Sequence, residues 1–326
     1  QRFLLVFHHC DLQSACQACQ PHTHLEVTTM KLQIVVLVTL AGLVAADEEL
    51  LDKYQTMSKS SFIEYFNAQD YSWKMAEYNN IDEHYSACAD FDEETMENLP
   101  LQTHDLEGIE LPDNFDARQQ WPQCETIKEI YDQGKCGSCW AFGAATPASD
   151  RTCIHKDVHV HLSEQDLQCL KKDACRGGSP MNAFKFWRDQ GLVTDKCKPY
   201  DAEKLNKSEP CVTECVSSDI NYKQDKHFGE KIYRISNESD LIKEELVKNG
   251  PIQATFIVYI DFKWYESGIY TVKVPVPIGA HSVRVIGYGV EDRVNYWLVA
   301  NSWGSGWGEK GLFRIKPLLL NTFVSL

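Results

Sequence analysis

The sequence lacks any excess of positive charge. Its 326 residues carry 47 acidic and 32 basic side chains, which give a formal net charge of −15 at pH 7. Proteins that bind nucleic acids concentrate Lys and Arg on one face to neutralise phosphates. The acidic balance therefore gives no reason to expect nucleic acid as a partner.

Long apolar runs are also scarce. The one strongly apolar stretch, residues 30–46, begins with a Met-Lys pair and ends in the small residues Val44-Ala45-Ala46. These features are typical of a secretory signal peptide, and the run is short for a bilayer span. We therefore expect a signal peptide at 30–46 and no transmembrane segment. Because a signal peptide belongs at an N-terminus, we interpret residues 1–29 as translated leader that is not part of the real protein.

Charge is distributed unevenly over the rest of the chain. Residues 47–110 contain 17 acidic and 3 basic residues, whereas residues 111–326 contain 28 and 27. The acidic segment is rich in aromatic residues, which solvated linkers usually lack. We interpret it as a propeptide that protonation of its carboxylates loosens at acidic pH, with a short helix near Ser60–Glu64. The aromatic residues that support this are Phe62, Tyr65, Phe66, Tyr71, Trp73, Tyr78 and Tyr85.

The motif Cys136-Gly-Ser-Cys139 has no second CxxC after the expected signal peptide and no surrounding βαβ pattern. These absences argue against its two alternative interpretations, half of a zinc site and a thioredoxin-like redox pair. Cys139 instead stands at the expected start of a helix, where unpaired N–H groups and a partial positive charge favour a thiolate. It is therefore a candidate nucleophile.

A thiolate nucleophile needs a proton-transfer partner. His281 opens an apolar, β-branched run expected to be a strand, and Asn301 ends a second expected strand. A Cys followed much later by His and Asn is the order of a Cys-His-Asn hydrolase. The cluster His155, His159 and His161 is expected on one surface of a strand or loop.

The chain resembles the papain-like cysteine proteases, and within them the cathepsin B-like enzymes, from about Leu51 to about Lys316. The matching segments are those around Cys139, Cys175–Gly178, Tyr222–His227 and Asn301–Gly304. The resemblance implies an α+β, two-lobed papain-like fold, with the Cys139 helix in one lobe and the His281 and Asn301 sheet in the other. An active-site cleft would separate the lobes, and 111–326 would be the peptidase domain.

The same resemblance implies peptide-bond hydrolysis through a thioester acyl-enzyme, without metal or cofactor. Cys139 would attack the carbonyl, His281, charged in a resting ion pair, would protonate the leaving amine, and Asn301 would orient the imidazole. The Gln133 amide and the Cys139 N–H would stabilise the oxyanion. The substrate-binding residues it implies are Gly177, Gly178, Ala280 and Trp303.

Nine cysteines follow Leu111, and an odd number in a secreted chain leaves one thiol unpaired. The sequence alone does not fix the pairing. The resemblance implies Cys139 as the unpaired residue, and the pairs Cys124–Cys153, Cys136–Cys175, Cys169–Cys211 and Cys197–Cys215. Sequons at Asn206 and Asn237 are candidate glycosylation sites, which fits a secretory route.

Several segments depart from the family pattern. The span between Tyr200 and Cys211 is short and lacks the His pair with which cathepsin B holds a substrate C-terminus, so we expect endopeptidase cleavage. Pro147 is expected to kink the Cys139 helix. Ala280 replaces a Gly and adds a methyl beside the catalytic His. From about Pro317 the chain diverges, which would remove one wall of the S2 pocket and a closing segment of the fold.

The resemblance implies a monomeric secreted zymogen, matured at acidic pH, in the lysosome or outside the cell, for example in a gut lumen. Its partners would be peptide and protein substrates, its own propeptide as inhibitor, and cystatin-like inhibitors. Pro147 and the altered C-terminus leave two alternatives open. One is a catalytically weak cathepsin B-like binding or decoy protein, and the other is an incomplete gene product that does not fold.

Overall fold

The computed structural model describes residues 48–78, 88–90, 98–102, 110–207, 210–320 and 322–325. The chain divides into two units, 1–50 and 51–326, and the second carries the fold described below. The expected leader and signal peptide lie outside the described residues, as does Tyr85 of the expected propeptide. Among the helices in the described ranges, none combines the length and the apolar character needed to cross a membrane.

Helices and strands both contribute, which confirms the α+β class. The helices are α2 (Lys59–Asn67), α4 (Ala117–Gln120), η2 (Glu125–Lys128), α5 (Cys139–Lys156), η3 (Gln165–Cys169), α6 (Pro180–Gln190), α7 (Ala202–Asn206), α8 (Ser239–Asn249), η4 (Ile260–Trp264) and η5 (Pro317–Leu319). The strands are β1 (Trp73–Met75), β2 (Leu101–Gln102), β3 (Phe115–Asp116), β4 (Tyr233–Ile235), β5 (Ile252–Tyr259), β6 (Tyr265–Tyr270), β7 (Pro277–Glu291), β8 (Val294–Ala300), β9 (Leu312–Ile315) and β10 (Thr322–Ser325).

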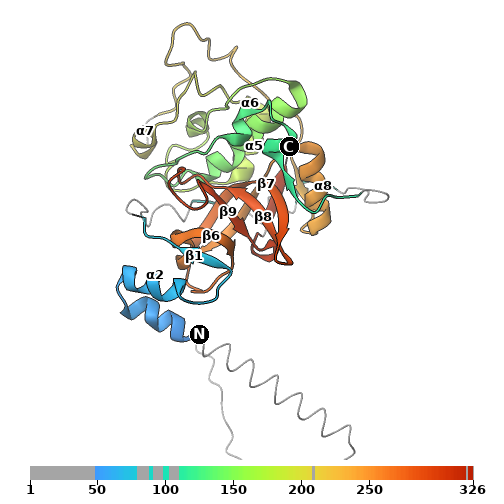
Figure 1. The fold of residues 1–326 in the computed structure, drawn as a ribbon. Coiled ribbons are helices and arrows are strands. Elements are labelled where there is room, and N and C mark those ends of the chain that lie inside the picture. The colour runs from blue at the N-terminus through green and yellow to red at the C-terminus, as the bar shows by residue number, and fades with distance from the viewer. Residues whose placement is uncertain are drawn as a thin grey trace, which may run out of the picture. The chain divides into compact units, whose positions relative to one another are not determined.

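A ten-stranded sheet runs in the order β1-β6-β9-β8-β7-β5-β10-β4-β2, with β3 paired to β7. Its centre is the antiparallel set β5, β7 and β8, whose β-branched and aromatic residues suit a half-buried pleated surface. A buried aromatic cluster fills the sheet half, and Phe262 contacts the rings of Trp303, Trp307 and Phe313 in tilted or edge-on arrangements. Figure 1 shows β6 to β9 beneath α5 and α6.

Helix α5 lies between α6 and β7 and joins the two halves of the fold. On the α6 side, Trp140, Met181 and Phe184 belong to one buried cluster. Helix α6 begins at Pro180, a favourable first helical residue, and Ser179 caps it by accepting a hydrogen bond from the Asn182 N–H. The site described below lies where α5 meets β7.

Helix α5 is continuous from Cys139 to Lys156, so Pro147 does not interrupt it. The carbonyl that Pro147 crowds belongs to Gly143, which has no side chain to add to the clash. Hydroxyls on either side support the turn, since Thr146 Oγ1 donates to the Phe142 carbonyl and Ser149 Oγ donates to the Ala145 carbonyl, both at 2.7 Å. Packing on two faces holds the helix despite the lost N–H.

The aromatic part of the expected propeptide folds against the sheet. Strand β1 pairs antiparallel with β6, and Trp73 Nε1 donates to the Thr271 carbonyl at 2.9 Å. Helix α2 is capped by Ser58, two residues before the expected start, and buries Phe62 and Phe66. Tertiary packing therefore explains the aromatic residues that the sequence placed in this acidic segment.

The divergent C-terminal residues supply a strand, contrary to the expected loss of a closing segment. Strand β10 inserts between β5 and β4 and pairs antiparallel with both. Phe323 and Val324 are buried, and the Phe323 ring contacts Trp297 edge-on. The four residues of β10 are thus enough to pair with a strand on each side.

Candidate active site

Cys139 is the first residue of α5 and is fully buried. The turn before it is fixed by Tyr200, whose hydroxyl donates to the Gln133 carbonyl and is hydrogen-bonded to Ser138 Oγ, both at 2.7 Å. The Ser282 N–H of β7 points at Cys139 Sγ from 3.4 Å. A sulfur at a helix N-terminus with a further N–H donor is in a setting that stabilises a thiolate.

His281 and Asn301 are brought together by the pairing of β7 with β8. The two strands are antiparallel, and Asn301 follows directly after β8. His281 Nε2 lies 2.7 Å from Asn301 Oδ1, and because that oxygen only accepts, Nε2 carries the proton. Trp303 covers this contact, with its ring 5.0 Å from the imidazole.

Burial lowers the pKa of His281 to about 4, although the hydrogen bond to Asn301 acts in the opposite direction. The imidazole is therefore neutral above that pH. The expected resting ion pair does not exist in this structure, because Cys139 is not a thiolate here. It is disulfide-bonded, so His281 has no negative partner to hold a proton.

Gln133 is fully buried beside the same sulfur atoms. Its Oε1 accepts from Ser302 Oγ at 2.6 Å, and its Nε2 donates to the Cys136 carbonyl at 2.9 Å. These bonds fix the orientation of the amide, and Nε2 lies 3.9 Å from the sulfur of Cys88. Three of the four predicted catalytic residues, Cys139, His281 and Gln133, thus surround one point, and the fourth, Asn301, holds His281 by its other ring nitrogen.

That point is occupied by Cys88 of the expected propeptide, which forms a disulfide with Cys139. The prediction that Cys139 is unpaired is therefore wrong for this form. It rested on counting cysteines only from Leu111 onward. The region from residue 48 onward holds ten cysteines, and that even number is the sequence signal that was missed. Cys88 Sγ stands where the reacting carbonyl of a substrate is expected.

Three of the predicted substrate-binding residues, Gly177, Gly178 and Ala280, lie against the same propeptide segment. The Gly178 N–H donates to the Cys88 carbonyl at 3.2 Å, and the Cys88 N–H donates to the Ala280 carbonyl at 3.1 Å. Gly177 has a φ of +82°, which favours glycine, and a Cβ on Gly178 would meet the Trp140 ring at 2.6 Å. The backbone of this turn is thereby free to bond an extended chain.

The remaining predicted disulfides are present in the structure. Bonds join Cys124 to Cys153, Cys136 to Cys175, Cys169 to Cys211, and Cys197 to Cys215. Of the candidate glycosylation sites, Asn237 is exposed just before α8, whereas the side chain of Asn206 in α7 lies outside the described residues.

One group of side chains is arranged closely enough to hold a metal ion. Ligand atoms of Cys88, Cys139 and His281 lie within 4.8 Å of one another. Soft metals bind cysteine as the thiolate, and both sulfurs are here bonded to each other. In this form the group therefore offers His281 alone as a ligand.

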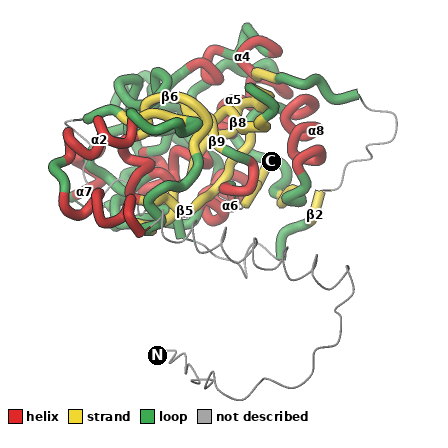
Figure 2. Tube along the Cα trace, turned by 60° about the horizontal axis from the view of Figure 1, so that its bottom comes forward, coloured by secondary structure: helices red, strands yellow, loops and turns green. Residues whose placement is uncertain are grey.

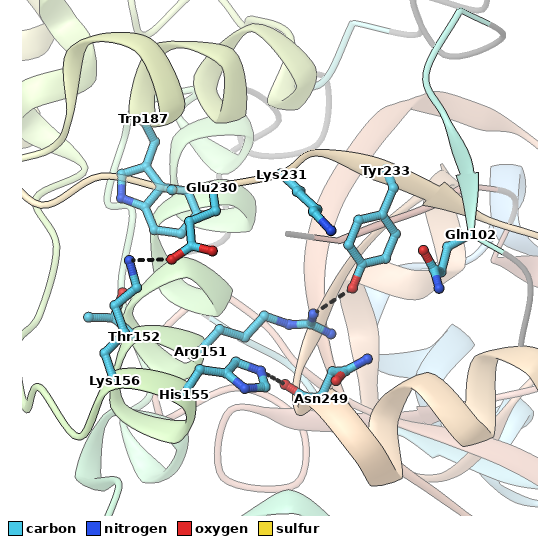
Figure 3. Close-up of a pocket in the computed structure, with 11 residues that line it drawn as sticks. Gln102, Arg151, Thr152, His155, Lys156, Trp187, Glu230, Lys231, Tyr233 and Asn249 are labelled. Atoms are coloured by element: carbon cyan, nitrogen blue, oxygen red, sulfur yellow. Dashed lines mark hydrogen bonds and ion pairs between the residues drawn. The ribbon is translucent and has the colours of Figure 1, made fainter.

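The other histidines in the described ranges, His155, His159, His161 and His227, belong to other parts of the fold. His155 belongs to the last turn of α5 rather than to a strand, and His161 contacts the buried Glu164 at 3.1 Å. The backbone of His227 pairs with that of Leu192. A cavity of about 500 Å³ at the far end of α5 contains paired charges, including Lys156 with Glu230, and none of the predicted catalytic residues (Figure 3).

Comparison with known proteins gives a consistent result. The model of the papain family of cysteine proteases matches residues 111–319. A cathepsin B-like cysteine proteinase of Schistosoma japonicum is 40% identical over 240 residues, which cover 65% of this chain and 70% of that protein. The cathepsin B-like cysteine proteinase 5 of Caenorhabditis elegans is 41% identical over 255 residues, or 67% and 74% of the two chains.

Solved structures extend the likeness to the proform. The procathepsin B S9 of Trypanosoma congolense superposes with a TM-score of 0.74 at 29% identity, over 82% of this chain and 97% of that one. A procathepsin L 3 from the larval midgut of Tenebrio molitor shares the fold, with a TM-score of 0.63 at 20% identity over 86% and 89%. These matches confirm the papain-like fold that the sequence predicted. The chain therefore belongs to the papain family of cysteine proteases and is a cathepsin B-like cysteine peptidase in a proform-like arrangement.

Proposed function

We propose that this chain is the secreted zymogen of a cysteine endopeptidase in which Cys139 is the nucleophile. The observation that carries the proposal is the convergence of three buried side chains on Cys88 Sγ, with Asn301 holding one of them, His281, from behind. His281 Nδ1 lies 3.4 Å from this sulfur and Gln133 Nε2 lies 3.9 Å from it, while Cys139 is bonded to it. A carbonyl in the same place would meet a nucleophile, an acid–base group and an oxyanion donor.

The proposed steps follow from these positions. The Cys139 thiolate attacks the scissile carbonyl, and the oxyanion receives hydrogen bonds from Gln133 Nε2 and the Cys139 N–H. His281, held through Nε2 by Asn301, transfers its Nδ1 proton to the leaving amine and then activates water for hydrolysis of the thioester. Removing one oxyanion donor from such a site costs about 3 kcal/mol of transition-state stabilisation.

We further propose that internal peptide bonds are the main targets. The span between Tyr200 and Cys211 contains the five-residue helix α7 and no histidine, so it offers no imidazole for a substrate carboxylate. Internally quenched peptides with free and with amidated C-termini distinguish the two modes. Equal cleavage of both supports endopeptidase action, whereas preference for the free carboxylate with release of dipeptides contradicts it.

The proposed function is tested by hydrolysis of a dipeptidyl fluorogenic amide at pH 5 by reduced, propeptide-free protein. Wild type should turn over, Cys139→Ser should be inactive, and Cys139 should be labelled by an epoxysuccinyl probe. A folded wild type that neither hydrolyses the amide nor is labelled at Cys139 supports the competing hypothesis of a binding or decoy protein. Comparing rates of maturation at pH 5 and pH 7 tests acid-triggered release, which the proposed lysosomal or extracellular destination requires.

A further inference from the structure

We infer that the propeptide of this zymogen closes the active site by a covalent bond, and that a small thiol must reduce the Cys88–Cys139 disulfide before the peptidase can act. The inference rests on the proposed role of Cys139 as nucleophile. It adds a requirement that pH alone does not meet, because protonation breaks hydrogen bonds and ion pairs but leaves a disulfide intact.

The backbone around Cys88 is held from both sides, which positions its sulfur. Its N–H donates to the Ala280 carbonyl of β7, and its carbonyl accepts from the Gly178 N–H. The next two residues repeat the pattern, since the Ala89 N–H also donates to Ala280 and the Asp90 N–H donates to Gly178 at 2.9 Å. The Cα atoms of Cys88 and Cys139 are 5.6 Å apart, within the ordinary range for a disulfide.

Cysteine parity supports the same assignment. All ten cysteines in the described part of the chain form five disulfides, so the proform has no thiol left over there. The segment after Leu111 holds nine cysteines, of which eight pair among themselves. Losing Cys88 therefore releases one sulfur only, and that sulfur is the predicted nucleophile. An oxidising secretory route favours formation of such a bond.

The reductive step is ordinary thiol–disulfide exchange. The thiolate of a small thiol attacks Cys88 Sγ and expels Cys139 as a thiolate, which is the better leaving group at a helix N-terminus beside His281. A second thiolate attacks the mixed disulfide on Cys88 and releases the oxidised small molecule. Two thiols supply two electrons and two protons, and the products are Cys88 thiol, the Cys139 thiolate–imidazolium pair and one external disulfide.

Burial makes the bond slow to reduce while the propeptide is seated. Cys88 is 1% exposed and Cys139 is 0% exposed, so an external thiol cannot reach either sulfur in the closed form. Opening requires the four backbone hydrogen bonds at Ala280 and Gly178 to break first. We therefore expect acid and reductant to act together, with acid loosening the propeptide and the thiol cutting the remaining tether.

Non-reducing peptide mapping tests the bond directly. Trypsin cannot cut between Lys74 and Arg118, so Cys88 lies on peptide 75–118, whereas Cys136 and Cys139 share peptide 136–151 and Cys175 lies on 173–176. After alkylation at acidic pH, the inferred bond predicts one assembly of all three peptides. A two-peptide assembly of 136–151 with 173–176 that is alkylated on Cys139, together with a separate peptide 75–118 alkylated on Cys88, overturns the inference.

Activation kinetics test the consequence. The experiment compares three proteins: wild type, Cys88→Ser and the neighbouring control Ala89→Ser. Each is brought to pH 5 with and without a small thiol. A chelator is present so that freed thiolates bind no metal. Without thiol, Cys88→Ser should show at least about tenfold more epoxysuccinyl labelling than wild type, because only it has a free thiolate. Ala89→Ser should behave as wild type.

The outcomes separate the inference from the proposed function. Equal labelling of wild type and Cys88→Ser without thiol contradicts the covalent closure. The three-peptide assembly with no turnover by any reduced form supports the closure and contradicts the peptidase proposal. If Cys88→Ser fails to fold, which circular dichroism reports, the peptide map of the wild type decides.

Discussion

His281 lies between an amide and a sulfur atom. Asn301 Oδ1 fixes one ring nitrogen at 2.7 Å, and the other faces Cys88 Sγ at 3.4 Å. In the disulfide form this sulfur is uncharged, and burial keeps the imidazole neutral. Once the bond opens, a thiolate at Cys139 stabilises the protonated ring. The charge state of this residue therefore reports whether the site is closed.

The pKa of His281 should rise when the disulfide is absent. In the oxidised wild type it is lowered to about 4, so the ring is neutral at pH 5.5. In Cys88→Ser the Cys139 thiolate stabilises the protonated imidazole, and the ring should remain charged at that pH. Carbon-13 NMR of labelled histidine measures the titration of His281 in both proteins. His155, at the other end of α5, serves as the internal control, and an unchanged His281 titration contradicts this reasoning.

His161 should stabilise the protein below neutral pH. Burial alone lowers its pKa, but Glu164 and other carboxylates outweigh that effect and raise it to about 9. A raised pKa means that the stabilisation is complete below pH 6.5 and is lost as pH increases to 9. His161→Gln should cost up to about 3 kcal/mol at pH 5.5 and little at pH 9, by urea unfolding.

The matched control for that prediction is His159→Gln. His159 pairs with Asp157 at 3.1 Å, but half of its side chain and most of that of Asp157 are exposed. Exposed pairs contribute little, so this variant should unfold like wild type at both pH values. Equal losses in the two variants would show that the buried carboxylate is not the cause.

Single residues were the part of the site that the sequence predicted best. Cys139, His281, Asn301 and Gln133 were found because local motifs and their order carry this chemistry. Cys88 was missed, since which cysteines meet depends on the path of the chain and not on any local pattern. The neutral state of His281 was missed for the same reason, because it follows from that bond.

At the level of elements, α5 is the piece that links the site to both halves of the fold. Its start at Cys139 was predicted from the sequence. Pro147 does not end the helix, because packing against α6 and β7 outweighs one lost hydrogen bond. The contact with β7 is close at Gly143, where a Cβ would lie 2.0 Å from Ser282 Oγ.

Gly143→Ala should therefore destabilise the fold although Ala is the better helix former. The new methyl must push Ser282 aside or move α5 away from β7, at a cost of about 1–3 kcal/mol. Because the Ser282 N–H faces Cys139 Sγ, labelling of Cys139 in the reduced protein should also slow. Thermal unfolding and labelling rates measure the two effects.

Gly306→Ala is the control for this change, because a Cβ there meets no atom within 4 Å. It should leave both the unfolding temperature and the labelling rate unchanged. If Gly143→Ala is equally silent, α5 and β7 are not packed as tightly as described.

For the whole molecule, the decisive element is the C-terminal strand. The sequence analysis predicted a lost closing segment, because the motif resemblance ends at about Lys316. Strand pairing depends on backbone groups, which any short segment provides, and Phe323 and Val324 are both buried. Register across three strands cannot be predicted from the tail alone, which is why β10 was not foreseen (Figure 2 shows the C-terminus at the sheet).

Truncating the buried aromatic side chain of this strand should be costly. Phe323 is 2% exposed and contacts Trp297, so Phe323→Ala should lower the free energy of unfolding by about 3–5 kcal/mol. The control is Leu318→Ala in η5, which removes a side chain that is 92% exposed. It should change stability by less than about 0.5 kcal/mol in the same denaturant titration. Similar losses in both variants would contradict the described position of β10.

The order of strands has a consequence for the processed enzyme. Strands β1 and β2, at the two ends of the sheet, both precede Leu111 and would leave with the propeptide. Processing then uncovers the backbone N–H and C=O groups of β6 on one side and β4 on the other. Open edges of this kind recruit further strands and promote aggregation. The propeptide would thus act as a solubilising cover as well as an inhibitor, and the processed form should be the one with the shorter shelf life at high concentration.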